Sequence, residues 1–198
     1  MTDEYSMSSM ASHLHHVYPD MQLRLALTVP GILHVEKSPS QIDAANALQS
    51  FQVNALGQLL LMKHLEPFLP TKSSPPFEET KGQLSLPSHA IYAMMAARVG
   101  SISDNCAGGW YSYRASKSSV FQIAKTFDLY LRTRSRNRAL AVALHPGTVK
   151  TDFTKDFWDG RPMLSSDEAA EKLLGVLAGV PMEKRGLCFD WKGEQVVP

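Results

Sequence analysis

Apolar residues along the chain recur at helical spacing in some segments and alternate with polar residues in others. Apolar side chains at helical intervals over 7–17, with Thr2 or Asp3 placed as an N-cap, predict a short opening helix. Over 23–29, leucines alternate with other residues until a Pro-Gly turn at 30–31, which predicts a strand. The chain therefore begins with one helix followed by one strand.

The central part of the chain continues this alternation with longer elements. The apolar spacing over 41–68 predicts one long, mostly buried helix or two abutting ones. Residues 71–85 are rich in Lys, Ser, Pro and Glu without an apolar period, which predicts a surface loop. A compact apolar run at 90–95 predicts a buried strand, and a loop at 101–110 leads into a helix over 112–134.

The C-terminal part adds a second buried strand, a helix and a short strand. The buried strand is predicted over 139–144, and Ser165 and Glu168 are spaced for a capping box on a helix that ends near residue 178. A short strand is predicted at 187–189. Strands that alternate with helices across short connections indicate an α/β protein with a parallel sheet covered on both faces.

Composition limits the number of domains and the kinds of partner. The chain has 198 residues, 44% of them hydrophobic, which is enough for one sizeable core and predicts a single domain over 1–198. The net charge of +1 predicts no broad attraction for nucleic acid or for an anionic membrane. The arginines at 132–138 form the one basic run, and a solvated helix end explains them better than a phosphate site.

The two cysteines indicate a reducing environment. Cys106 and Cys188 are far apart and form no CxxC motif, so neither a disulfide framework nor a cysteine zinc site is predicted. The acidic start of the chain does not resemble a leader peptide, and no apolar run is long enough to span a bilayer. We therefore expect a soluble, cytoplasmic protein without a metal.

Tyr113 and Lys117 are the strongest candidates for chemistry. They are four residues apart at the start of a predicted helix, so their side chains share one face. A phenol placed there can pass a proton, but its ordinary pKa near ~10 is too high for a good base at neutral pH. A neighbouring ammonium favours the phenolate, so Lys117 is expected to lower the pKa of Tyr113.

The segments around this pair resemble the active site of a known family. GSISDN at 100–105 and GGWYSYRASK at 108–117 are similar to the active-site segment of short-chain dehydrogenases/reductases, in the branch of small carbonyl reductases and C-factor-like proteins. FQVNA at 51–55 resembles the family's central-helix asparagine motif. PGTVKT at 146–151 and FDWKG at 189–193 resemble its Pro-Gly motif and its closing strand and turn.

The resemblance implies hydride transfer between NADP(H) or NAD(H) and a carbonyl or alcohol. It implies that Tyr113 is the general acid, that Lys117 adjusts its pKa and holds the nicotinamide ribose, and that Asn54 anchors a relay water. Asn54 has an alternative role as a helix-interior amide bonded to a neighbouring strand. The residues that the resemblance places beside the cofactor are Gly31, Tyr113, Lys117, Pro146, Gly147, Thr148, Val149 and Thr151.

The chain departs from the family at the position of the substrate-orienting serine. The matching stretch at 95–100 reads MAARVG and has no hydroxyl group. Ser101 is the candidate replacement, together with Ser103, although a loop serine more often bonds local backbone. The segment 151–164 contains three aromatic residues, Phe153, Phe157 and Trp158. They indicate either an apolar lid over the site or simple helix packing.

Two further departures concern the cofactor. TVPG at 28–31 stands where the family usually has NNAG, and no glycine-rich turn precedes residue 2. The start TDE resembles the end of the family's third strand. The resemblance therefore implies an N-terminally truncated, partial Rossmann-like sheet that lacks the first βαβαβ half, with the strand at 23–29 as an edge.

This reading leads to three expectations. The chain is expected to have low stability or to associate, because of the edge strand, and to bind the cofactor weakly. The alternative to an enzyme is a non-catalytic remnant that pairs with another short-chain dehydrogenase subunit. The helices at 41–69 and 112–134, which commonly form a dimer interface in the family, would mediate this pairing or a homo-oligomer.

Overall fold

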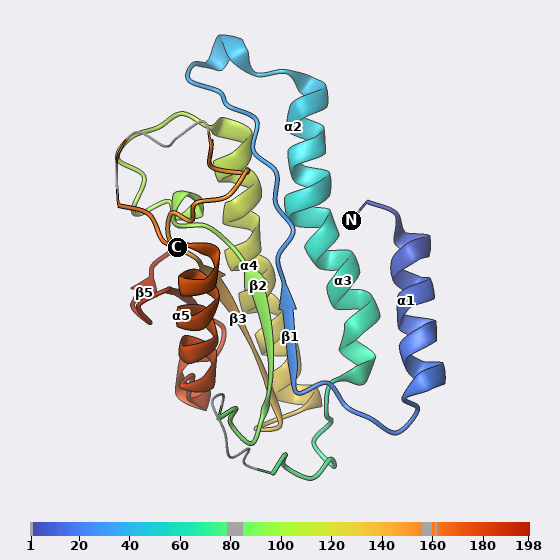
Figure 1. Ribbon diagram of the computed structural model, residues 1–198. Helices are drawn as coiled ribbons and strands as arrows, with labels where there is room; N and C mark the ends of the chain where they lie inside the picture. The colour runs from blue at the N-terminus through green and yellow to red at the C-terminus, as the bar shows by residue number, and fades with distance from the viewer. Residues whose placement is uncertain (1, 79–84, 156–159, 161) are drawn as a thin grey trace.

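A five-stranded sheet forms the centre of the molecule (Figure 1). The structure is a computed structural model that describes residues 2–78, 85–155, 160 and 162–198. The strand order is β1-β2-β3-β4-β5; the first four strands are parallel and β5 is antiparallel to β4. The strands are β1 (Leu25–Thr28), β2 (Ala90–Met95), β3 (Ala139–His145), β4 (Cys188–Asp190) and β5 (Gln195–Val196). The predicted α/β class is confirmed, whereas β5 was not predicted.

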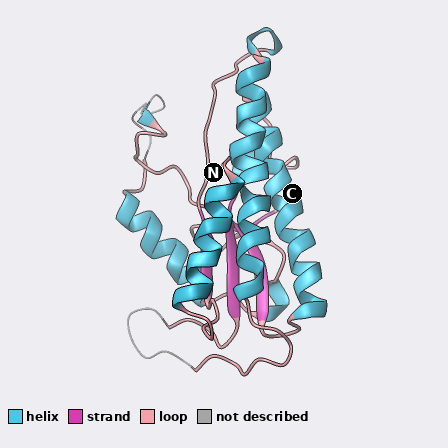
Figure 2. Cartoon of the chain, turned by 90° about the vertical axis from the view of Figure 1, so that its right-hand side faces the viewer, coloured by secondary structure: helices cyan, strands magenta, loops and turns pink. Residues whose placement is uncertain are grey.

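Helices cover both faces of this sheet (Figures 1 and 2). The helices are α1 (Glu4–Val17), α2 (Ala44–Phe51), α3 (Gly57–Leu65), α4 (Tyr111–Arg134) and α5 (Ser166–Ala178). Helices α2, α3 and α4 lie along one face, α5 lies along the other, and α1 packs beside α3. Among the described residues, no helix is both long and apolar enough to cross a membrane.

Alternate side chains of the central strands fill two separate cores. On one face, Tyr92 packs with Val120 and with Phe127 of α4, whose ring meets the Tyr92 ring edge-on at 5.2 Å between centroids. On the other face, Ile91 packs with Leu173 of α5. Because both faces are covered, β2 is apolar at every position rather than alternating.

The long helix predicted over 41–68 is present, but it contains a π-turn. Helix α2 continues through a π-helical turn, Gln52–Leu56, into α3, and a 3₁₀ turn, Glu66–Phe68, ends the run. A π-turn inserts one extra residue per turn and often marks a functional position in a helix. Asn54 lies within this turn and is fully buried.

The ends of three helices agree with the sequence patterns. The Asp3 carboxylate accepts a hydrogen bond from the Tyr5 amide and caps α1, which begins at Glu4. The prediction that TDE at 2–4 is the end of a strand is therefore wrong. Ser165 and Glu168 form the predicted capping box of α5. At the end of α4, Arg132 pairs with Asp128, as expected for a helix end on the surface.

Two sequence-based predictions extend beyond the described residues. The described parts of the loop predicted over 71–85 contain no helix or strand, and residues 79–84 lie outside the description. Phe157 and Trp158 of the proposed lid also lie outside the described residues.

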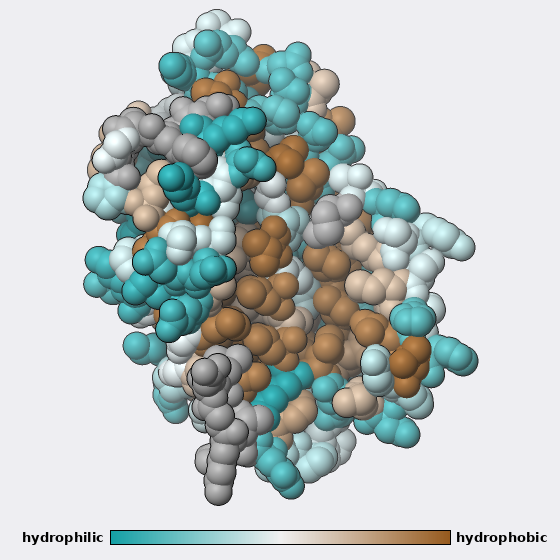
Figure 3. Space-filling view, in the orientation of Figure 1, coloured by the Kyte–Doolittle hydropathy of each residue, from teal (hydrophilic) through white to brown (hydrophobic). Residues whose placement is uncertain are grey.

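Strand β1 lies at the edge of the sheet, as expected, and within the described part of the chain it pairs with β2 alone. Leu27 is 37% exposed and Val29, which follows the strand, is 60% exposed. Figure 3 shows apolar side chains gathered on the molecular face that is seen in the orientation of Figure 1. An exposed apolar strand edge is a template for pairing with another chain.

We expect Leu27→Lys to reduce self-association of the 198-residue chain, because a charge at the edge of β1 opposes strand pairing. The measurement is light scattering against protein concentration. The matched control is Ile42→Lys, which places the same charge at a residue that is 45% exposed and away from the edge. Equal effects of both substitutions would show that net charge, rather than the strand edge, controls association.

Candidate active site

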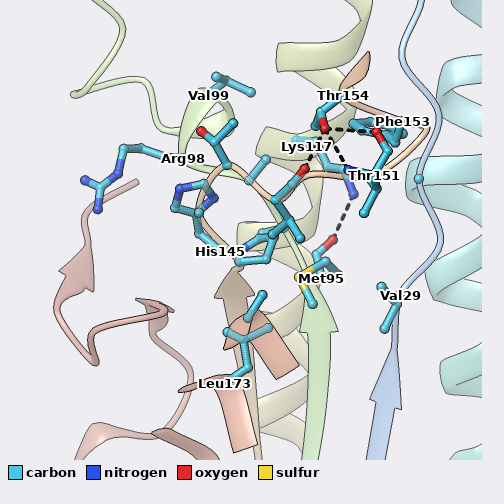
Figure 4. A pocket seen from close by; sticks show the side chains of 18 of the residues that line it. Val29, Met95, Arg98, Val99, Lys117, His145, Thr151, Phe153, Thr154 and Leu173 are labelled. Carbon is cyan, nitrogen blue, oxygen red and sulfur yellow. Dashed lines mark hydrogen bonds between the residues drawn. The ribbon is translucent and has the colours of Figure 1, made fainter. Parts of the chain in front are cut away.

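A cavity of about 530 Å³ lies at the carboxyl ends of the parallel strands (Figure 4). In open parallel sheets, ligands bind at this edge. Its wall is formed by the segment after β1, the segment after β2, the start of α4, the segment after β3 and one side of α5. Most of the lining side chains are apolar, including Val29, Met95, Val99, Phe153 and Leu173.

Tyr113 and Lys117 both line this cavity from the first turns of α4. Their spacing of four residues places them on one face of the helix, and the Lys117 Nζ atom lies 6.0 Å from the centroid of the Tyr113 ring. Both side chains are buried, with Lys117 only 2% exposed. The structure thus brings together the two residues that the sequence singled out.

The Lys117 ammonium is bound by main-chain carbonyls at the ends of two strands. Its Nζ atom donates to the Met95 oxygen at 2.9 Å, which Figure 4 shows, and to the Pro30 oxygen at 3.2 Å. Burial lowers the pKa of Lys117 to about 8, because removal from water disfavours the charged form. This lysine can therefore give up a proton closer to neutrality than an exposed one.

Burial also raises the pKa of the Tyr113 phenol above its ordinary value. This finding corrects the expectation that the Lys117 ammonium lowers the phenol pKa in this chain. Burial is the cause of the rise, because the loss of water disfavours the phenolate. The raised pKa keeps the phenol protonated, so it holds a proton that a carbonyl oxygen could accept, but it also makes the phenol a weaker acid.

Asn54 connects the segment after β1 to α4. Its Nδ2 atom donates to the Ile32 oxygen at 3.0 Å and to the Ser116 Oγ atom at 2.9 Å, and its Oδ1 atom accepts from the Ile32 amide at 2.8 Å. Ser116 in turn donates to the Tyr113 main-chain oxygen at 2.9 Å. These bonds correspond to the structural alternative, an amide that ties neighbouring segments together; the role in a water relay stays a prediction.

Ser101 does not face the cavity. Its side chain is buried, and its Oγ atom accepts from the Asp104 amide at 3.0 Å, which stabilises a local turn. Ala96 and Ala97, where the resemblance places a serine, do line the cavity. The structure therefore separates Ser101 from the Tyr113–Lys117 pair, and the side chains at 96 and 97 offer no hydroxyl.

All of the residues expected beside the cofactor line the cavity: Gly31, Tyr113, Lys117, Pro146, Gly147, Thr148, Val149 and Thr151. Gly147 has a φ of 79°, and a Cβ atom there would lie 2.6 Å from the Trp191 ring. A Cβ atom on Gly31 would lie 3.4 Å from the Lys117 Nζ atom and would fill the space beside the ammonium. Gly147 therefore lets the Trp191 ring pack closely against the segment after β3, and Gly31 leaves space beside the Lys117 ammonium.

Trp110, Arg98 and His145 of the cavity wall were not predicted, whereas Phe153, which also lines the cavity, was one of the residues of the proposed apolar lid. The Tyr113 ring lies between Trp110 and Phe153, at centroid distances of 6.4 Å and 6.1 Å. Arg98 pairs with the buried Asp190 at 2.7 Å. Burial, followed by the charge of Arg98, lowers the pKa of the neighbouring His145 to about 4. The wall beside the phenol is thus aromatic, and its one histidine is neutral.

The chain is similar in sequence to known proteins. No family model matches the chain. A 1-hydroxy-2-glutathionyl-2-methyl-3-butene dehydrogenase of Rhodococcus sp. strain AD45 is 27% identical over 186 residues, which cover 94% of this chain and 72% of that protein. The C-signal protein of Myxococcus xanthus is 29% identical over 157 residues, which cover 78% of this chain and 80% of that protein.

Solved structures show the same fold. The NADPH-bound carbonyl reductase from chicken fatty liver superposes with a TM-score of 0.82 at 24% identity, over 100% of this chain and 74% of that one. The carbonyl reductase Sniffer of D. melanogaster superposes with a TM-score of 0.83 at 22% identity, over 100% of this chain and 75% of that one. The chain therefore spans about three quarters of the length of these proteins.

Proposed function

We propose that this chain is a short-chain dehydrogenase/reductase that transfers a hydride between a nicotinamide dinucleotide and a carbonyl or alcohol substrate. The observation that carries this proposal is the position of Tyr113 and Lys117 on one wall of an apolar cavity at the carboxyl ends of the strands. A phenol at that position can donate a proton to a carbonyl oxygen as the carbon accepts hydride.

NADP(H) or NAD(H) is the proposed cofactor, and its chemistry when bound is to give or accept the hydride. One solved relative, the chicken carbonyl reductase, is described as NADPH-bound. In this chain, Lys117 would bind the ribose hydroxyls, and Thr148 and Thr151 would contact the nicotinamide end. The open space beside Gly31, next to the Lys117 ammonium, supports this fit.

The proposed chemistry of the chain itself is proton donation in a site with little water. Tyr113 donates the proton, and the aromatic side chains of Trp110 and Phe153 exclude water from the phenol. The side chains of Ala96 and Ala97 supply no hydrogen bond to the substrate. Tyr113 therefore has to orient the carbonyl as well as protonate it.

The test is consumption of NADPH by the purified 198-residue chain with 4-nitrobenzaldehyde as the carbonyl probe, followed by the loss of NADPH absorbance. We expect carbonyl-dependent oxidation of NADPH. Calorimetric titration with NADPH and NADH, without substrate, measures cofactor binding independently. A chain that binds neither cofactor and oxidises neither would contradict the proposed function.

A second candidate function is pairing with another subunit of this fold. Apolar side chains on the outer surfaces of the long helices are exposed, and this observation favours an interface. These residues are Leu48, Phe51, Leu56 and Leu59 on the continuous run from α2 to α3, and Leu129 and Tyr130 on α4. Single exposed apolar residues are ordinary, but a set along two adjacent helices is typical of an interaction surface.

We expect Leu59→Glu to weaken association through these helices, because the substitution would place a charge in a buried apolar contact. Sedimentation velocity at several protein concentrations measures the effect. Ile102→Glu is the control, since Ile102 is also exposed and lies in the loop before α4. An unchanged sedimentation coefficient for Leu59→Glu would exclude this face as an interface.

A further inference from the structure

The first turn of α4, which carries Tyr113, lacks a cap from its own sequence. Trp110 occupies the N-cap position in the left-handed conformation, with a φ of 51°, and its side chain makes no capping hydrogen bond. The first amides of a helix have no partner within the helix and need an acceptor from elsewhere. For most helices a Ser, Thr, Asp or Asn at the N-cap provides that acceptor.

Glu36 provides the acceptor in this protein, from a segment 76 residues earlier in the chain. Its Oε2 atom accepts from the Ser112 amide at 2.7 Å, and its Oε1 atom accepts from the Ser112 hydroxyl at 2.6 Å. The Glu36 main-chain oxygen also accepts from the Trp110 amide at 2.6 Å. Three hydrogen bonds thus join the Glu36 residue to the start of α4.

Glu36 is buried, so its carboxylate depends on these hydrogen bonds. The residue is 2% exposed, and a carboxylate is costly to bury unless hydrogen bonds and opposite charge compensate for the lost water. The positive end of the α4 dipole and the two donors of Ser112 supply that compensation. Glu36 therefore has one favourable position, directly against the turn that holds Tyr113.

We propose that Glu36 is a positioning residue that fixes the Tyr113 phenol in the cavity through the first turn of α4. Ser112, to which Glu36 binds, is the immediate neighbour of Tyr113. Glu36 also belongs to the segment after β1, and Gly31 and Leu33 of that segment line the cavity. The carboxylate thus joins the segment after β1, which lines the cavity, to the turn of α4 that carries the proton donor.

Asn54 forms a second tie between the same two segments, one turn further along α4. It joins Ile32 to Ser116, whereas Glu36 joins the segment to Ser112. With both ties, the helix has little freedom to rotate or shift relative to the segment after β1. Loss of Glu36 leaves the tie at Asn54 intact, so the helix is expected to stay folded while its first turn loosens.

The proposal rests on the proposed function, and its test uses Glu36→Ala with Glu36→Gln as the conservative variant. A misplacement of about 1 Å can reduce a rate by roughly 10²-fold. We expect Glu36→Ala to lower kcat by roughly 10- to 100-fold with KM changed by less than about threefold. In Glu36→Gln, the amide oxygen can accept from the Ser112 amide while the amide nitrogen donates to the Ser112 hydroxyl, so most of kcat is expected to return.

The matched control is Asp43→Ala, which removes the N-cap of α2. A purely structural loss of a cap would give both alanine variants similar losses of Tm and of activity. Equal losses of kcat at equal losses of Tm would overturn the proposal. If Glu36→Ala does not fold, Glu36→Leu, which fills the same volume without an acceptor, is judged by the same criteria.

Amide hydrogen exchange of residues 110–115 decides the proposal even if the chain has no reductase activity. We expect Glu36→Ala to speed exchange in this segment and Glu36→Gln to restore it, while Asp43→Ala speeds exchange only at the start of α2. Unchanged exchange at 110–115 in Glu36→Ala would overturn the positioning role. An inactive wild-type chain with faster exchange in Glu36→Ala would instead contradict the proposed function alone.

Discussion

Replacement of Tyr113 by phenylalanine is expected to lower kcat by roughly 10²- to 10⁴-fold, the usual contribution of a general acid. Phenylalanine keeps the ring between Trp110 and Phe153, so the shape of the cavity and the packing of α4 should persist. Only the hydroxyl, and with it the proton for the carbonyl oxygen, is lost. The measurement is NADPH oxidation at saturating carbonyl, together with Tm.

Tyr111→Phe is the matched control for this experiment. Tyr111 begins the same helix, but it is exposed and does not line the cavity. We expect the control to keep kcat within about twofold of the wild-type value, since surface substitutions away from a site have small effects. A Tyr113→Phe variant with wild-type kcat would show that the phenol is not the proton donor.

Lys117 is expected to reduce the stability of the chain in a pH-dependent way. In the folded chain its pKa is lowered to about 8 by burial, against the ordinary value of 10.5. Between these two pH values the unfolded chain binds more protons at this residue than the folded chain does. The free energy of unfolding therefore rises with pH from about 8 to 10.5 by up to ~1.4 kcal/mol per pH unit. Below pH 8 the destabilisation is fully present.

Comparison of the wild-type chain with Lys117→Met isolates this effect. The variant lacks the titrating group, so the difference between the two free energies of unfolding should change by about 3 kcal/mol across this window. The two carbonyls that lose their donor, on Met95 and Pro30, add a cost that does not depend on pH. Urea unfolding at a series of pH values measures the difference.

The pH dependence of the wild-type free energy of unfolding is less informative by itself than the difference between wild type and Lys117→Met. The reason is that other buried groups titrate in an overlapping pH range. Burial raises the pKa of the Cys188 thiol from 9.0 to about 12, so the folded chain keeps a proton that the unfolded chain releases above pH 9. Stability from this group is lost as pH rises from 9 to 12. Lys184→Met, at an exposed position, should leave the wild-type pH profile unchanged. A constant difference between wild type and Lys117→Met over pH 8 to 10.5 would contradict the proposed titration.

The buried Lys117 ammonium lowers the stability of the fold but is required by the proposed activity. A buried ammonium is unfavourable for folding, whereas binding to a ribose and a nearby phenol requires a cation at this position. Lys117→Met is therefore expected to lose activity while the pH-dependent penalty disappears. The same conflict applies to Glu36, whose buried carboxylate accepts two hydrogen bonds from the start of α4.

The sequence by itself determined the elements whose patterns are local. The apolar runs of β2 and β3, the helical spacing of α4 and the capping box of α5 each lie within a single segment. Tyr113 and Lys117 were predictable for the same reason, since a spacing of four residues on a helix places both side chains on one face. The family motifs added five residues after β3 that line the cavity: Pro146, Gly147, Thr148, Val149 and Thr151.

Only the tertiary structure decided how distant segments act on one another. Glu36 and Ser112 are 76 positions apart, and nothing in either local pattern indicates that they share a cap. The position of Ser101 away from the cavity, the ties made by Asn54, and the raised pKa of Tyr113 likewise depend on burial and on contacts across the fold. Periodicity reports what one segment prefers, whereas desolvation and hydrogen bonding between segments arise only once the sheet and helices have packed.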